Sequence, residues 1–121
     1  MTSPMQDQDY THNEHMVDPL PQCIQGKSKK QLTLIDCVYL CLRKRYRSFW
    51  EIQNTILDQK GRMYGEPSIS AAIRALRHPE NRDLYNLETD LSVEVVDRRR
   101  RPNSQGYEYK IINRRSVLMM K

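Results

Sequence analysis

One feature of the sequence constrains the possible fold most. It consists of two helix-forming segments joined by a short turn and followed by two segments in which apolar and polar residues alternate. The helical segments are SFWEIQNTILDQKG (residues 48–61) and EPSISAAIRALRH (residues 66–78), and GRMYGE (residues 61–66) connects them. Apolar residues that alternate with polar ones follow in residues 91–112. This order of helix, turn, helix and hairpin predicts a small α+β fold that is mainly α.

The first of these helices has clear predicted ends. Ser48 and Glu51 form the S-x-x-E pattern of a capping box, and Gly61 is a natural C-terminal stop. The aromatic residues Phe49 and Trp50 follow helical spacing and are expected in the core.

The next helix carries the best candidate site. Pro67 suits its first turn, with Glu66 or Ser68 as the cap, and Pro79 ends it. At 100° per residue, the apolar side chains gather on one side: Ile69, Ala72, Ile73 and Leu76. The opposite side carries Ser70, Ala71, Arg74 and His78, with Arg77 at the flank. Small residues followed by arginine suit a helix that enters a major groove, and the alternative is an ordinary solvent-facing helix surface.

Four adjacent arginines characterise the predicted hairpin. Residues 91–96 and 107–112 alternate with a period of two, and DRRRRPNSQG (residues 97–106) is the expected tip. Adjacent arginines repel each other, so they gain more from phosphates or a narrow minor groove than from the fold. A solvated basic loop is the alternative.

Two further segments complete the expected domain. A largely buried helix is predicted from Ser28 or Lys29 to Arg45, with Cys37 and Cys41 as small buried hydrophobes. The polar connector in residues 80–90 has Leu84, Tyr85 and Leu87 as expected core anchors.

Charge divides the chain into a domain with two tails. Residues 1–26 hold four of the 15 acids and none of the 20 basic residues, so the rest carries a net charge of +9. We expect an acidic arm (1–26) that is disordered or loosely docked, one domain (27–113) and a basic, then apolar tail (114–121). A basic domain suits a polyanionic partner, although a basic surface kept for solubility is the alternative.

Several classes of protein are disfavoured. The sequence lacks a membrane-spanning apolar run, a signal peptide and the common nucleotide-binding and metalloprotease motifs. The histidines lie in polar segments, and His12, His15 and Cys23 fit no ordinary zinc spacing. We therefore expect neither an enzyme nor a cofactor, and the three cysteines indicate a reducing, cytoplasmic location.

The segment SISAAIRALR followed by VEVVDRRRRPNSQGYEYKI resembles the winged helix-turn-helix domains of small phage- or prophage-encoded DNA-binding proteins. The resemblance covers roughly residues 31–112 and implies three helices followed by a β-hairpin wing. It implies base contacts from Ser68, Ser70, Ala71 and Arg74, and wing contacts from the four arginines. The long connector after His78 and the acidic arm depart from the pattern.

Together, residues and resemblance predict a nucleoid-associated DNA-binding protein, such as a small transcriptional regulator or a replication accessory factor. The predicted double-stranded-DNA contacts are Ser68, Ser70, Ala71, Arg74, Arg77, His78, Arg98, Arg99, Arg100, Arg101 and Lys110. The alternative is an adaptor that binds a protein through the acidic arm or the apolar patch in residues 117–120, where a homodimer contact is a further option. RNA binding is a third hypothesis, lowered by the lack of surface aromatic pairs.

Overall fold

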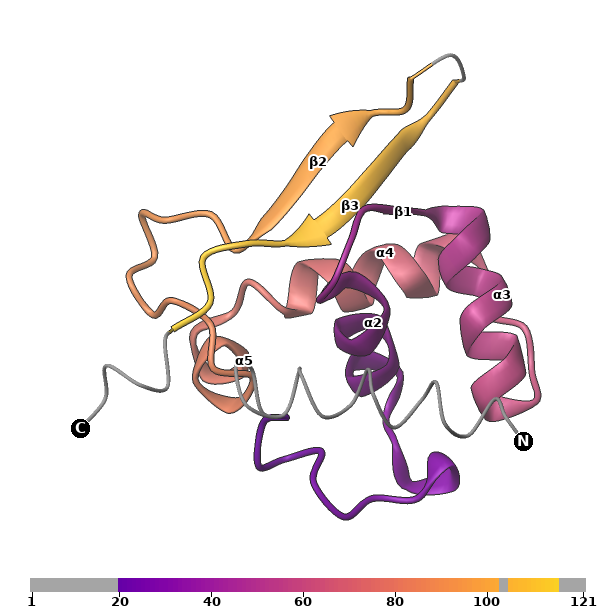
Figure 1. Ribbon diagram of the computed structural model, residues 1–121, viewed down its shortest axis with the longest axis horizontal. Helices are drawn as coiled ribbons and strands as arrows, with labels where there is room; N and C mark the ends of the chain where they lie inside the picture. Colours follow the sequence, from indigo (N-terminus) through magenta and orange to yellow (C-terminus); the bar gives the residue numbers. More distant parts are fainter. Residues whose placement is uncertain (1–19, 103–104, 116–121) are drawn as a thin grey trace, which may run out of the picture.

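A computed structural model describes residues 20–102 and 105–115 and shows an α+β fold that is mainly helical (Figure 1). Its elements are η1 (Lys29–Gln31), α2 (Leu34–Leu42), β1 (Arg47–Ser48), α3 (Phe49–Lys60), α4 (Glu66–Ala75), α5 (Pro79–Leu84), β2 (Val96–Arg100) and β3 (Tyr107–Ile111). The predicted class is confirmed, but the described residues form four α-helices rather than three, and the sheet has a third strand.

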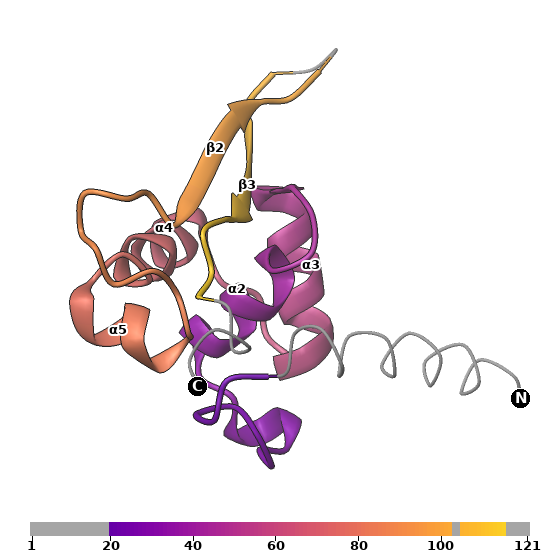
Figure 2. The same cartoon turned by 60° about the vertical axis from the view of Figure 1, so that its left-hand side comes forward.

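The core surrounds α2, which packs against α3, α4 and β3 and lies centrally in both views (Figures 1 and 2). Cys37, Val38, Tyr39 and Leu42 of this helix are almost fully buried. Burial raises the pKa of the Cys41 thiol to about 11, so this side chain stays protonated at neutral pH. The prediction that Cys37 and Cys41 are buried, unbridged hydrophobes is confirmed.

Helix α2 is shorter than the predicted helix from Ser28 or Lys29 to Arg45, and that prediction was wrong at both ends. Thr33 and Asp36 form a capping box in which the Asp36 backbone N–H donates to the Thr33 hydroxyl and the Thr33 N–H donates to the Asp36 carboxylate. This cap starts the helix at Leu34, because the Thr33 backbone is extended.

Helix α3 has the predicted ends. The Glu51 N–H donates to the Ser48 hydroxyl, the Ser48 N–H donates to the Glu51 carboxylate, and Gly61 ends the helix at a φ of 75°. The expectation that Trp50 belongs to the core was wrong, because its side chain is 69% exposed. Helical spacing could not decide this point, since Ile52 and Ile56 already fill the buried side of the helix.

Helix α4 buries the predicted side chains, while the segment after it differs from prediction. Ile69, Ala72, Ile73 and Leu76 lie in the core, and Gly65 rather than Glu66 or Ser68 is the N-cap. The expected polar connector contains α5. Tyr85 and Leu87 are buried as predicted, whereas Leu84 is 50% exposed and is not a core anchor.

The sheet is antiparallel in the order β1–β3–β2, and the β2–β3 hairpin projects from the helical body (Figures 1 and 2). The hairpin strands begin at Val96 rather than near Leu91, so Arg98, Arg99 and Arg100 lie in β2 and not in the tip. Only Arg101 of the four arginines follows the strand. Strand β1 was not predicted, because two residues carry no detectable alternation.

The folded domain starts before Lys27, where the sequence predicted its first residue. Ile24 of the expected arm is 4% exposed and joins the core. The side chain of Asp36 is buried and accepts hydrogen bonds from Lys27 Nζ at 2.8 Å and from the Tyr85 hydroxyl at 2.5 Å. This contact connects the start of the body to α2 and to the chain after α5.

Some predictions fall on residues that the structure does not describe. They concern most of the acidic arm with His12 and His15, and the apolar patch in residues 117–120. Among the helices of the described residues, none has the length and apolar character needed to cross a bilayer.

Candidate nucleic-acid interface

The outward face of α4 is small and polar near its N-terminus and basic one turn later. Ala71 and Arg74 are exposed, and Ser70 is half-buried. The Arg74 guanidinium donates from Nη1 to the Ser70 hydroxyl at 2.8 Å. This hydrogen bond holds the arginine along the helix, with its remaining N–H groups accessible to a partner.

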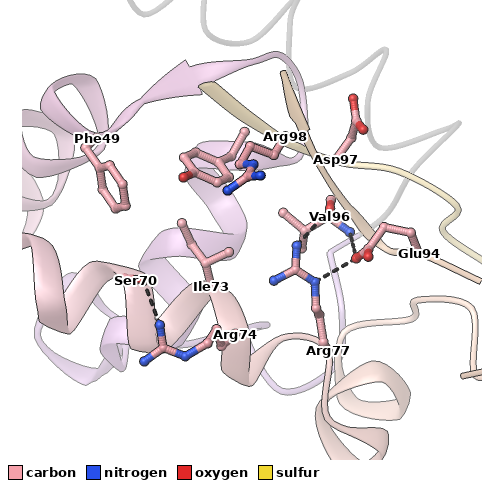
Figure 3. Close-up of a pocket in the computed structure, with 10 residues that line it drawn as sticks. Phe49, Ser70, Ile73, Arg74, Arg77, Glu94, Val96, Asp97 and Arg98 are labelled. Atoms are coloured by element: carbon pink, nitrogen blue, oxygen red, sulfur yellow. Dashed lines mark hydrogen bonds and ion pairs between the residues drawn. The ribbon is translucent and has the colours of Figure 1, made fainter. Parts of the chain in front are cut away.

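A groove separates this face of α4 from the hairpin (Figure 3). Its apolar floor comes from Phe49, Ile73, Val96 and Tyr109, and the Phe49 and Tyr109 rings meet edge to face at 5.3 Å. Polar and charged side chains line the rest of it: Ser70, Arg74, Arg77, Glu94, Asp97 and Arg98. The groove therefore brings together three of the predicted helix contacts, Ser70, Arg74 and Arg77, and one of the predicted hairpin contacts, Arg98.

Arg77 connects α4 to the start of the hairpin. Its Nε donates to the Glu94 carboxylate at 2.7 Å, and its Nη2 donates to the Val96 carbonyl at 3.0 Å. The Glu94 carboxylate also accepts from the backbone N–H groups of Val95 and Val96. Partial burial raises the pKa of Glu94, but these hydrogen bonds and the Arg77 charge outweigh burial and leave it below its ordinary value.

Arg82 organises the loop that precedes the hairpin. This side chain is 4% exposed. It donates from Nε to the Arg77 carbonyl and from Nη1 to three carbonyls of the loop, those of Glu88, Asp90 and Val93. These bonds explain why residues 88–93 form a loop instead of extending β2.

The hairpin arginines have different surroundings. The Arg99 guanidinium lies 3.6 Å from the Tyr46 ring centroid and forms an ion pair of 2.8 Å with Glu108. The Tyr46 hydroxyl in turn donates to the Asp97 carboxylate. Arg98 lies over the Tyr107 ring at 4.4 Å, and both Arg98 and Arg100 are exposed.

The remaining predicted contacts lie around this surface. Ser68 is exposed in the first turn of α4, and His78 is exposed as the N-cap of α5. Lys110 of β3 is half-buried opposite Asp97, and Arg101 donates its backbone N–H to the Gly106 carbonyl. Seven of the predicted contacts do not line the groove: Ser68, Ala71, His78, Arg99, Arg100, Arg101 and Lys110.

No protein-family model, curated protein or solved structure matches this chain. The described residues also contain no group of three or more His, Cys, Asp or Glu side chains that could hold a metal ion.

Three residues that shape the interface were missed from the sequence. Tyr46 contacts Asp97, which lies 51 positions later, so its local sequence gives no signal. Arg82 contacts nearer residues, but these contacts depend on the fold of the loop after α5, which no repeating pattern of residues indicates. Glu94 was placed in a strand by alternation, although its side chain folds back onto the backbone. An acid two residues before a strand is too common a pattern to predict this.

Proposed function

We propose that the chain is a double-stranded-DNA-binding protein with a winged helix-turn-helix fold. Helices α3 and α4 form the helix-turn-helix, α4 enters the major groove, and the β2–β3 hairpin is the wing. Within this class, a small regulator of transcription or an accessory factor of replication, of the phage or prophage type, fits best.

One observation carries the proposal. The outward face of α4 and the arginine-bearing hairpin border the same groove, although 20 or more residues separate Arg74 from Arg98 in the chain. A recognition helix beside a basic hairpin can contact base edges and phosphates at the same time. The net charge of +9 outside residues 1–26 adds attraction for a polyanion.

Arg74 is the proposed base-contacting residue. Its neighbours Ser70 and Ala71 are small, so a base edge can approach the helix closely. A guanidinium can donate two hydrogen bonds to guanine O6 and N7, and such a pair contributes about 1–3 kcal/mol of discrimination.

Fluorescence anisotropy with a random duplex at two salt concentrations tests the proposal. We expect a Kd on the order of 10⁻⁴–10⁻⁶ M that weakens roughly 100-fold between 50 and 200 mM salt if about four phosphates are contacted. Site selection then gives the preferred sequence. Arg74→Ala should relax preference at one base pair by about 1–3 kcal/mol. An unchanged preference in that variant would exclude α4 as the recognition helix.

A protein-interaction adaptor is the second candidate, favoured by the exposed Trp50. This indole is 69% exposed on α3, where Leu57 is 37% exposed two turns later. Exposed tryptophan is enriched at protein interfaces. An adaptor predicts no binding to the random duplex at low salt, and a partner affinity that falls in Trp50→Ala and changes little with salt.

A further inference from the structure

The β2–β3 hairpin has two faces of different charge. Side chains of a strand alternate between the faces of a sheet, and directly paired residues share a face. Val96, Arg98 and Arg100 therefore share one face with their partners Ile111, Tyr109 and Tyr107. Asp97 and Arg99 share the other face with Lys110 and Glu108.

The first face, which we call the inner face, turns toward α4. Val96 and Ile111 at its base are buried in the core, and Val96, Arg98 and Tyr109 line the groove. Its charged residues are Arg98 and Arg100, and it carries no acid. Neither arginine has an ion pair with another described residue, and the stacking of Arg98 on Tyr107 leaves its N–H groups able to donate.

The second face, which we call the outer face, is electrically balanced. It carries two acids, Asp97 and Glu108, and two basic residues, Arg99 and Lys110. Arg99 is held between Glu108 and the Tyr46 ring, and the Tyr46 hydroxyl donates to Asp97. Although Asp97 also borders the groove, its carboxylate points away from Ile73 and Arg74 (Figure 3).

We propose that the hairpin contacts DNA through its inner face alone. The side chains of the outer face instead hold the hairpin in place on the domain. Arg98 and Arg100 bind phosphates of the strand that passes between α4 and the hairpin. Arg99 is a positioning residue that, with Tyr46, Asp97 and Glu108, fixes β2 and β3 against the segment that leads into β1.

Two physical reasons support this division, which rests on the proposed DNA binding. A phosphate that approached Arg99 would also approach Glu108, and the like charges would repel. If Arg99 turned toward DNA instead, Glu108 would lose its ion-pair partner and the Tyr46 ring its stacked cation. Arg98 and Arg100 have no such competing acid, because the inner face carries none.

The adjacent residues Arg98 and Arg99 provide a matched test, because both are arginines of the same strand. Each alanine variant of the full chain is titrated with one duplex over a series of salt concentrations. Arg98→Ala should reduce the slope of log K against log salt by about 0.9, which weakens binding by about eightfold at 0.1 M salt. Arg99→Ala should leave that slope at the wild-type value and lower the Tm of the free protein.

A second matched pair of variants, Lys110→Ala and Arg100→Ala, keeps the test decisive if Arg99→Ala does not fold. Lys110→Ala removes an outer-face charge that has no ion pair among the described residues, and should leave the slope unchanged. Arg100→Ala, on the inner face, should reduce it.

The possible results separate this inference from the proposed function. The slope of log K against log salt could fall equally in Arg98→Ala and Arg99→Ala, or it could fall in Lys110→Ala. Either result would contradict contact through the inner face alone, while the proposal of DNA binding would stand. A wild-type protein that binds no duplex at low salt overturns both.

Discussion

At the scale of single residues, Asp36 joins parts of the chain that are far apart in sequence. Its carboxylate accepts from the Thr33 N–H at the start of α2, from Lys27 and from Tyr85. Burial raises the pKa of Asp36, but the hydrogen bonds from Lys27, Tyr85 and Thr33 outweigh burial and bring it below its ordinary value of 3.8. Tyr85 responds in the opposite direction, because burial and the Asp36 charge raise the pKa of its hydroxyl.

The direction of the Asp36 pKa shift sets how the free energy of unfolding depends on pH. Because the folded pKa of Asp36 is below its unfolded value, its contribution to stability is present above about pH 4 and is lost as pH falls through the folded pKa. We expect Asp36→Ala to lower the free energy of unfolding at pH 7 by about 2–3 kcal/mol, because it leaves Lys27 and Tyr85 without this partner.

Urea denaturation of both proteins at pH 7 and at pH 3 measures this contribution. The difference between wild type and variant should shrink at the lower pH. A difference that grew at pH 3 would contradict the assigned direction of the pKa shift.

At the scale of elements, the sequence predicted the helices better than the sheet. Capping residues and periodicity are local, so Ser48, Glu51 and Gly61 located α3, and the spacing of Ile69, Ala72, Ile73 and Leu76 gave the buried side of α4. Strand β1 depends on pairing of Arg47 with Tyr109, which lies more than 60 residues away. Local patterns carry no information about such a partner.

The candidate site was predicted in part for the same reason. The outward side chains of α4 follow from helical geometry, and their exposure agrees with the prediction for Ala71 and Arg74. The sequence could not show that Arg77 is engaged by Glu94, or that Arg99 is engaged by Glu108 and Tyr46. Those contacts depend on where the hairpin lies relative to the helices.

Gly61 gives a prediction for the turn between α3 and α4. Its φ of 75° is left-handed, and a Cβ at this position would meet no atom within 4 Å. Gly61→Ala should therefore destabilise the fold through backbone strain alone, by about 1–2 kcal/mol.

Thermal unfolding measures this effect, and Gly65→Ala is a useful control because Gly65 has a negative φ of −76°. The control should change stability less than Gly61→Ala. Equal losses in the two variants would argue against strain as the cause.

At the scale of the whole molecule, charge is distributed unevenly along the chain. The segment 1–19 contains Asp7, Asp9, Glu14 and Asp18 and no Lys or Arg, so its removal raises the net charge from +5 to +9. Long-range attraction to a polyanion increases with net charge and is screened by salt.

We therefore expect a variant that lacks residues 1–19 to associate with duplex DNA faster than the full chain at low salt. The advantage should disappear at high salt, and stopped-flow anisotropy at both concentrations measures it. A variant with the four acids replaced by Asn or Gln is the matched control for chain length. If truncation accelerated association but neutralisation did not, charge would not be the cause.

The position of β3 in the middle of the sheet has a consequence for biosynthesis. Its partners β1 and β2 are made earlier, and β3 is the last of the described strands to leave the ribosome. Until then Val96 lacks its partner Ile111, and Tyr109 is absent from the groove floor. A nascent chain can form its helices early, but the complete groove exists only once β3 has been made. The order of synthesis thus delays completion of the groove until the last of the described strands has been made.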